Sequence, residues 1–332
     1  MLKERPSFSI DRLHSGGLIT NYNCTSSCGH CLYSCSPRRH KHYIDRETLA
    51  KNLEKILSLG CASIHIGGGE PFLNLDGLKM VIEITLSLGM RIEYVETNSS
   101  WYRDSDSARE TLASLRKSGL LTLLISMSPF HNEHIPFFRV KGVLGACRAV
   151  GINVFPWIVE FYQEIDAFDD RTTHSLSEYQ NRYGQDYVKR LPSRYWVHFG
   201  GRALNTFAPV FGVKPWQEIL SSSQGGCTEL LDVSHFHFDL FGNYIPGLCS
   251  GLAIHRDDLG TMISPEQYPI LHTLFQEGIR GLFDLASRRY DFKPSNGYLS
   301  KCHLCFDIRR HMALEQGIVS RELQPKDFYE QV

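Results

Sequence analysis

Several features that would direct a protein to a membrane or to nucleic acid are missing from this sequence of 332 residues. The longest apolar stretch, around residues 120–127, is far too short to span a bilayer, and residues 1–6 contain no apolar signal core. A formal net charge of −1 excludes a broad basic field that would attract nucleic acid or an anionic membrane surface. We therefore expect a cytoplasmic globular protein with no membrane or nucleic-acid partner.

Cysteine, by contrast, is plentiful, with ten residues in the chain. In a reducing compartment this number favours metal binding or catalysis over a disulfide framework. Three of them, Cys24, Cys28 and Cys31, follow the first strand-like run (residues 17–22) with the spacing Cys-x-x-x-Cys-x-x-Cys. Three thiolates can hold a cubane iron–sulfur cluster and leave one of its irons open to a substrate or cofactor.

Two other interpretations of this loop remain open from the spacing alone. Zinc also binds cysteine and histidine at short spacings, and His30 lies within the loop. Alternatively, Cys35 could be a fourth ligand, which would close an electron-transfer cluster that has no open iron. The first alternative predicts a zinc-stabilised binding module and the second an electron-transfer protein, so neither predicts an enzyme.

The first half of the chain repeats a helix that ends in glycine and runs straight into an apolar strand. The glycines are residues 60, 89, 119 and 151, and the strands that follow cover residues 62–66, 91–95, 121–125 and 152–155. Glycine suits the left-handed position that ends a helix, and alternating strands and helices predict a parallel sheet. With a strand before Cys24 and another near residues 195–199, we predict an α/β fold, a partial six-stranded (β/α) TIM-like barrel over residues 1–205. An open doubly wound sheet is the alternative.

In either topology the chemistry takes place at the carboxyl ends of the strands, where polar and glycine-rich segments gather in this sequence. These segments are residues 67–71, 96–99, 126–131, 156–160 and 200–203. The triple glycine of the first segment matches neither the Gly-x-Gly-x-x-Gly pattern nor a P-loop. Among the catalytic candidates, His131 could bind substrate or move protons, and Cys35 could donate hydrogen. A bystander thiol is the simpler interpretation of Cys35.

Together these motifs resemble those of the radical S-adenosylmethionine (radical SAM) enzymes, over roughly residues 15–205. The three-cysteine motif is similar to the cluster motif of that superfamily, and the Gly-Gly-Glu-Pro run one strand later is similar to its methionine-binding motif. The residues that the resemblance assigns to S-adenosylmethionine are Gly68, Gly69, Glu70, Pro71, Asn98, Ser126 and Arg202. One difference is His30, which stands where members usually have an aromatic residue before the third cysteine.

The resemblance implies a 4Fe–4S cluster on the three cysteines, with S-adenosylmethionine bound at the open iron. Reductive cleavage would give methionine and a 5′-deoxyadenosyl radical that abstracts hydrogen from a substrate. It also implies a reductant such as flavodoxin or ferredoxin as a partner. The substrate would be a small metabolite or a peptide. Because only about 15 residues precede the first strand, we expect no fused peptide-recognition domain and favour a small molecule, or a peptide that another protein delivers.

The last part of the chain, residues 206–332, carries four more cysteines: Cys227, Cys249, Cys302 and Cys305. The last two have the Cys-x-x-Cys spacing of metal ligands, and the first two would lie at the open ends of a β-hairpin around residues 241–243. This α+β segment resembles the auxiliary-cluster extensions, called SPASM or twitch, of many radical SAM enzymes. The resemblance implies a second 4Fe–4S cluster that assists oxidation or binds substrate.

Two further metal interpretations concern this segment. A structural zinc ion on the same four cysteines is the alternative to a cluster. His235 and His237 alternate along the predicted hairpin and could also bind metal. Histidines in that pattern are more typical of a solvent-facing or hydrogen-bonded core position, so we do not assign them a metal.

Overall fold

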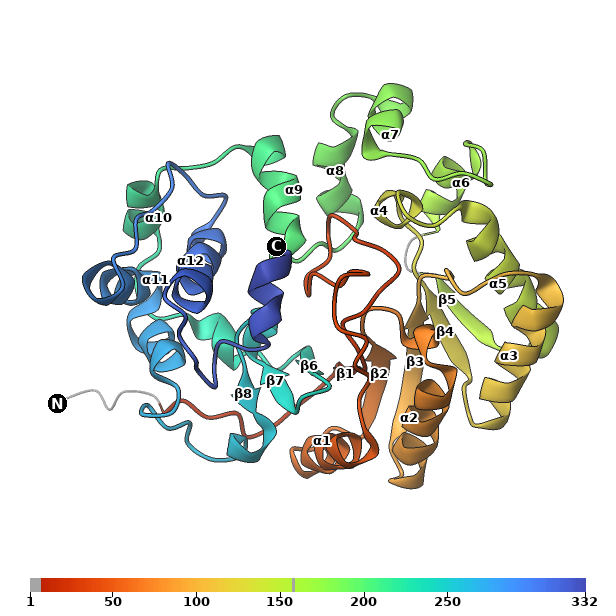
Figure 1. Cartoon of the computed structure of the whole chain (residues 1–332), viewed down its shortest axis with the longest axis horizontal. Coiled ribbons are helices and arrows are strands. Elements are labelled where there is room, and N and C mark those ends of the chain that lie inside the picture. Colours follow the sequence, from red (N-terminus) through yellow and green to blue (C-terminus); the bar gives the residue numbers. More distant parts are fainter. Residues whose placement is uncertain (1–6, 157–158) are drawn as a thin grey trace.

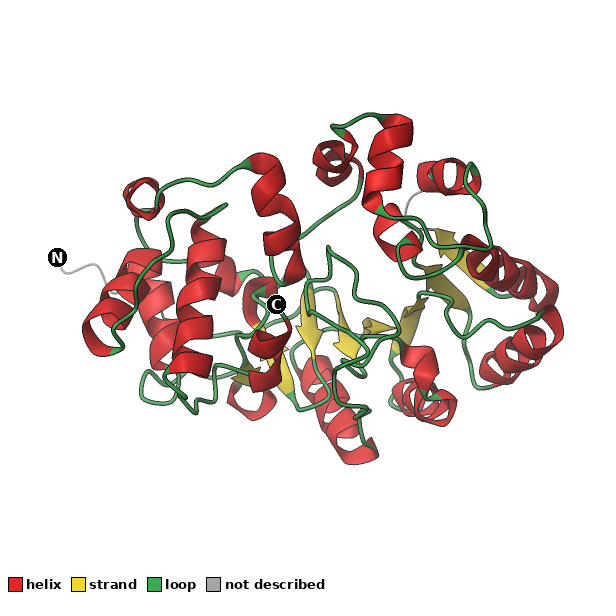
Figure 2. Cartoon of the chain, turned by 45° about the horizontal axis from the view of Figure 1, so that its top comes forward, coloured by secondary structure: helices red, strands yellow, loops and turns green. Residues whose placement is uncertain are grey.

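The computed structural model describes residues 7–156 and 159–332, which form one open sheet covered by helices (Figure 2). Its eight strands lie in the order β5-β4-β3-β2-β1-β6-β7-β8. The strands are β1 (Gly16–Ile19), β2 (Ser63–Gly67), β3 (Arg91–Thr97), β4 (Thr122–Ile125), β5 (Asn153–Pro156), β6 (Phe236–Phe238), β7 (Asn243–Ile245) and β8 (Ile254–His255). Strands β1 to β6 pair in parallel, whereas β7 and β8 pair antiparallel at one edge. This mostly parallel, open sheet confirms the predicted fold class.

Helices run along the whole described chain, and in the first half four of them end one or two residues before the glycines at 60, 89, 119 and 151, as the sequence predicts. They are α1 (Arg46–Ser58), α2 (Leu75–Ser87), α3 (Ser105–Lys117), α4 (Pro129–Asn132), α5 (Phe137–Val150), α6 (Glu160–Asp166), α7 (Leu176–Tyr183), α8 (Tyr187–Arg194), α9 (Arg202–Phe211), α10 (Trp216–Ser222), α11 (Pro269–Arg289) and α12 (Lys301–Arg310). Asp45 caps α1 by accepting a hydrogen bond from the Thr48 backbone at 2.8 Å. Among the described residues, no helix combines the length and apolarity that a membrane span requires.

The core of the first half lies between the sheet and helices α1, α2, α3 and α5, which Figure 1 shows along the outside of the strands. Leu49, Leu53 and Ile56 of α1 are fully buried, as are Ile64 and Ile66 of β2. Burying a side chain of this size contributes about 1.5–3 kcal/mol. The apolar stripe of the helix and the apolar strand therefore determine each other's placement.

Residues 195–199, predicted as the sixth strand, form an irregular segment between α8 and α9, so this prediction is wrong. The alternation that suggested a strand is real, because Tyr195 and Val197 are buried while Trp196 is 55% exposed. It arises from packing on the cysteine loop, where the ring of Tyr195 lies 5.3 Å from that of His30. The sixth parallel strand is instead β6, which pairs with β1.

The predicted hairpin around residues 241–243 is confirmed and consists of β6 and β7. The Asp239 carboxylate accepts the backbone N–H groups of Phe241 and Asn243, both at 2.9 Å, and Gly242 adopts a φ of 84° in the turn. Because β6 pairs with β1, the sheet runs without a break from the first half of the chain into the last. The predicted division after residue 205 remains a prediction.

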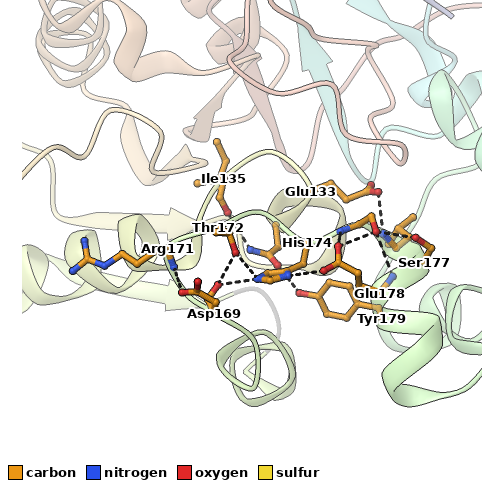
Figure 3. A network of polar contacts seen from close by, with 12 residues as sticks. Glu133, Ile135, Asp169, Arg171, Thr172, His174, Ser177, Glu178 and Tyr179 are labelled. Atoms are coloured by element: carbon orange, nitrogen blue, oxygen red, sulfur yellow. Dashed lines mark hydrogen bonds and ion pairs between the residues drawn. The ribbon is translucent and has the colours of Figure 1, made fainter.

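A network of polar contacts fixes the short helix α4, which carries His131, against α7 (Figure 3). The hydroxyl of Tyr179 donates to the Asn132 side chain at 2.7 Å. His174 bonds to the Glu178 carboxylate at 3.0 Å, within the same turn that begins α7. Helix α4 is thereby held against α7.

Candidate active site

The cysteine loop follows β1 at the carboxyl edge of the sheet and forms one wall of a cavity of about 240 Å³. Cys24 and Cys28 are buried, and Cys31 is partly exposed. The other walls come from the ends of β2, β3 and β4 and from the segment before α9. The residues predicted for the site that line this cavity are Cys24, Cys28, Cys31, Cys35, Gly68, Gly69, Pro71, Asn98, Ser126, His131 and Arg202.

Arg202, the first residue of α9, holds the cysteine loop from the opposite side of the cavity. Its side chain donates from Nε to the carbonyl oxygen of Cys28 at 3.0 Å and from Nη2 to that of Cys35 at 2.5 Å. Its backbone N–H donates to the carbonyl oxygen of Cys31 at 3.2 Å. The preceding Gly201 has a φ of 52°, and a Cβ there would lie 2.2 Å from the carbonyl oxygen of Leu32. Only glycine lets α9 approach the loop this closely.

The cysteine thiols of the loop differ in acidity. A hydrogen bond from the Cys35 thiol, together with the positive charge of Arg202, lowers the pKa of Cys31 to about 6. Burial raises the pKa of Cys24 to about 12. Cys35 itself is buried, and its thiol is committed to Cys31. The Cys35 thiol therefore contacts Cys31, a candidate cluster ligand of the same loop.

Among the residues that the resemblance assigns to S-adenosylmethionine, Glu70 is the one whose side chain faces the protein interior and does not line this cavity. The carboxylate is fully buried and accepts the N–H groups of Asn98 at 2.6 Å and Phe72 at 3.1 Å. Burial raises its pKa to about 7. Glu70 thus joins the loop after β2 to the loop after β3.

The glycines before Glu70 permit close packing between two loops. The N–H of Gly69 donates to the carbonyl oxygen of Asn21 at 2.7 Å, and a Cβ on Gly69 would lie 2.1 Å from the carbonyl oxygen of Asn23. Gly68 has a φ of 149°. The resemblance assigns both glycines to S-adenosylmethionine, and the structure shows that the loop after β1 packs against them on one side.

Asn98 connects the end of β3 to the first cysteine. Its side-chain amide donates to the sulfur of Cys24 at 3.4 Å and to the hydroxyl of Thr25 at 3.1 Å. Its own backbone N–H is held by Glu70. Asn98 is therefore a fixed donor to a candidate metal ligand, which lowers the cost of a thiolate at that position.

A layer of flat rings covers the cavity beside the third cysteine. His30 stacks on Phe130 with ring centroids 4.6 Å apart, and His131 meets His30 edge to face at 4.9 Å. The Nδ1 of His131 bonds to the Ser128 hydroxyl at 2.8 Å, and burial lowers the pKa of His131 to about 4. The ring is therefore neutral at neutral pH. Ser126 lies nearby at the end of β4.

Sequence reasoning gave little weight to one acidic residue and to three histidines that line the same cavity. Glu96 of β3 lines it with a pKa that burial raises to about 7. His65 of β2, with His235 and His237 at β6, lines the floor. Alternating burial along each strand is the signal that could have placed these side chains on the inner face of the sheet.

The four late cysteines line a second cavity of about 360 Å³. Cys227 and Cys249 come from the two sides of the β6–β7 hairpin, and Cys302 and Cys305 from α12. Arg309, which is 4% exposed, lines the same cavity and donates to the Ser250 carbonyl oxygen and the Tyr329 hydroxyl. Its buried positive charge suits a site that gathers thiolates.

Sulfur spacing distinguishes two kinds of metal site. A single zinc ion with Zn–S bonds of about 2.3 Å draws its sulfur ligands to within about 3.8 Å of one another. Among the described residues, no three cysteine sulfurs lie within 4.8 Å of one another, either in the first loop or in the second cavity. A cubane cluster spreads its thiolates over several irons and accommodates the wider spacing.

Residues 18–155 match the sequence model of the Radical SAM superfamily. This part of the chain contains the cysteine loop and strands β2 to β4, and the match confirms, for these residues, the resemblance seen in the sequence.

The curated relatives match only part of their length. The putative peptide biosynthesis protein YydG of Bacillus subtilis (strain 168) is 30% identical over 132 residues, which are 38% of this chain and 39% of YydG. The uncharacterized protein MJ0804 of Methanocaldococcus jannaschii is 27% identical over 122 residues, 36% of this chain and 40% of that protein. Among solved structures, native anSMEcpe with bound AdoMet has a TM-score of 0.44 at 14% identity, covering 90% of this chain and 96% of that chain.

Proposed function

We propose that this protein is a radical SAM enzyme in which Cys24, Cys28 and Cys31 hold a 4Fe–4S cluster with one open iron. The observation that carries the proposal is that these cysteines, in a segment of the Radical SAM superfamily, face one cavity at the carboxyl edge of the sheet. Thiolate donors suit iron, and all three cysteines line the same cavity. The donor set therefore fits the group.

When bound, the cluster supplies the electron that cleaves S-adenosylmethionine to a 5′-deoxyadenosyl radical, which abstracts hydrogen from the substrate. The chain's own residues position this chemistry. Arg202 fixes the backbone at Cys28 and Cys35, and Asn98 donates to the Cys24 sulfur. Cys35 acts as a positioning residue, because its thiol donates to Cys31.

The wall beside the third cysteine suits the nucleoside of S-adenosylmethionine. His30 presents a flat ring backed by Phe130, which supplies the planar surface that an aromatic residue provides elsewhere in the superfamily. Ser126, Gly68, Gly69 and Pro71 complete the lining between the strand ends. We assign substrate binding or proton transfer to His131, whose ring lines the cavity and is held at Nδ1 by the Ser128 hydroxyl.

We further propose that Cys227, Cys249, Cys302 and Cys305 hold an auxiliary 4Fe–4S cluster in the second cavity. Their convergence on one cavity supports this proposal. The buried side chain of Arg309 lines the same cavity and compensates the negative charge that four thiolates bring to it. Such a cluster would assist oxidation or bind the substrate.

The substrate in this proposal is a peptide side chain or a small metabolite. The name of YydG, a putative peptide biosynthesis protein, supports a peptide, and that relative matches the part of the chain that contains the cysteine loop. The electron would come from a flavodoxin or a ferredoxin. A peptide that shifts the spectrum of the reconstituted protein on titration would identify this substrate class.

Iron and sulfide content after anaerobic reconstitution tests both clusters at once. We expect about eight irons per chain, four for each cluster. A Cys28→Ala variant should retain about four irons and lose reductive cleavage of S-adenosylmethionine, whereas Cys302→Ala with Cys305→Ala should lose the other four. Cys147→Ala, which changes a buried thiol on α5, is the matched control. Cleavage activity in Cys28→Ala would refute the proposal, and about four irons in the unmodified chain would refute the auxiliary cluster.

A further inference from the structure

A pair of histidines meets across β1 at the floor of the cavity that the cysteine loop covers. His65 of β2 and His237 of β6 are both in register with Gly17, one on each side of it. Their Nε2 atoms are 3.1 Å apart. A Cβ on Gly17 would lie 2.2 Å from the Nε2 of His65, so the glycine leaves the space in which the two rings meet.

A third histidine joins this pair. His235 lies two residues before His237, and residues spaced by two share a face of a strand. Each of the three side chains offers a ring nitrogen, and these nitrogens all lie within 4.8 Å of one another. Among the residues described, no other three side chains drawn from histidine, cysteine, aspartate and glutamate bring their ligand atoms so close together. All three rings line the cavity.

The spacing of the pair suits a metal ion. With metal–nitrogen bonds of about 2.0–2.1 Å, a tetrahedral zinc ion holds its nitrogen ligands about 3.3 Å apart. Two Nε2 atoms at 3.1 Å could also share one proton in a hydrogen bond. A hydrogen bond involves only two of the rings, however, and does not explain why the nitrogen of a third ring lies close to them. Imidazole ligands select zinc-like transition metals, whereas magnesium and calcium require oxygen ligands.

The surroundings orient the rings and keep them neutral. Tyr33 bonds through its hydroxyl to the Nδ1 of His237 at 2.8 Å, which leaves Nε2 of that ring to face His65. The ring of His65 stacks with two others. Its centroid lies 5.1 Å from that of Tyr94 and 5.2 Å from that of His235. Burial lowers the pKa of His65 to about 3, so its nitrogens are not protonated at neutral pH.

We propose that His65, His235 and His237 bind one zinc-like divalent transition-metal ion on the floor of the cavity. Three protein ligands leave a fourth position open, which is the arrangement of reactive zinc sites and not of closed structural ones. That open position faces the same cavity as the cysteine loop. The site does not depend on the iron–sulfur clusters, because it shares no ligand with them.

The test measures zinc by mass spectrometry in the full chain after its clusters have been reconstituted, so that the cysteines are occupied. After equilibration with zinc chloride and removal of free ion, we expect about one zinc per chain, with nitrogen and not sulfur ligands in X-ray absorption. His65→Gln and His237→Gln should lose this zinc and keep their iron. His14→Gln, which changes an exposed histidine, is the matched control.

Two further variants separate metal binding from misfolding. Gly17→Ala keeps all three ligands but fills the space between the rings, so it should lose the zinc. Tyr33→Phe removes only the bond to His237 and should weaken zinc binding about tenfold or more without removing the site. No bound zinc in the unmodified chain, sulfur ligation, or zinc retained by His65→Gln would overturn the proposal. Iron content reports separately on the clusters.

Discussion

The guanidinium of Arg202 donates to the carbonyl oxygen of Cys28 across 174 residues of sequence. This bond, with its companion to Cys35, ties the first helix after the irregular segment to the loop after the first strand. The geometry of the three cysteines is therefore set partly by a residue far along the chain, which makes that residue a sensitive point for testing the site.

Replacing Arg202 with glutamine should destabilise the cluster-free protein by about 1.5–3 kcal/mol, because hydrogen bonds from a charged donor contribute that much. Arg202→Lys should recover only part of the loss, since lysine cannot reach two carbonyl oxygens with a planar fork. Urea unfolding measures the effect, and the rate of iron release to a chelator should rise in both variants. Arg148→Gln, at an exposed position on α5, serves as the control. Equal unfolding midpoints for all three variants would contradict the role given to Arg202.

Gly201→Ala and Gly212→Ala form a matched pair at the two ends of α9. Both glycines have positive φ, 52° and 78°, so each substitution carries a backbone penalty of about 1–2 kcal/mol. A Cβ at residue 212 meets nothing within 4 Å, whereas one at residue 201 meets the Leu32 carbonyl oxygen at 2.2 Å. We expect reconstitution of the first cluster to fail in Gly201→Ala and to succeed in Gly212→Ala. Iron and sulfide analysis decides, and full iron content in both would be inconsistent with the close approach described.

Asn98→Asp should loosen the cluster without unfolding the chain. The substitution removes the amide that donates to Cys24 and adds a negative charge beside a thiolate. Outer contacts of this kind typically change metal affinity about 10–100-fold. Iron release to a chelator provides the measurement, with Asn153→Asp on the exposed surface of β5 as the control. Release at the rate of the unmodified protein would exclude a role for this bond.

The buried histidines predict loss of stability in acid. Burial lowers the pKa of His131 from 6.5 to about 4, so between these values the unfolded chain binds a proton that the folded chain does not. The contribution of His131 to the free energy of unfolding of the cluster-free protein should therefore decrease as the pH falls from about 6.5 to about 4, whereas the raised pKa values of Glu70 and Glu96 act in the opposite direction. His131→Asn should reduce this slope, and His14→Asn should leave it unchanged. Identical slopes in all three proteins would show that His131 does not titrate in this way.

Much of the first half was predictable because local signals and burial agree there. The glycines at 60, 89, 119 and 151 end their helices with φ values of 91°, 75°, 112° and 74°, and each precedes a strand at or near the predicted residues. Backbone preference alone places these helix ends. The apolar residues Leu49, Leu53 and Ile56 recur at the spacing of a helix, which is a local signal of the same kind.

The sixth strand was not predictable from the same signals. Alternation at residues 195–199 reports which side chains are buried, and it cannot tell whether they pack on a strand or on a loop. The actual neighbour of β1, β6, lies more than 200 residues away in sequence. Strand pairing at such separation depends on the whole fold, so no local sequence pattern indicates which strands pair.

For the site, the cysteine spacing identified the loop, and the structure shows how distant residues support it. That Glu70 faces Asn98 and that Gly69 packs on Asn23 follow from the crossing of two loops, which no spacing encodes. The histidine trio was missed because His65 and His237 are 172 residues apart and become neighbours only through Gly17.

The pairing of β1 with β6 also decides how the chain can be divided. A fragment that ended at residue 205 would leave one whole side of β1 without a hydrogen-bonding partner. An uncovered strand edge is a template for joining other chains, so such a fragment should associate or aggregate even though it retains every ligand of the first cluster. Shortened versions of this protein for structural or engineering work should therefore keep the hairpin of residues 236–245 together with the strand that it completes.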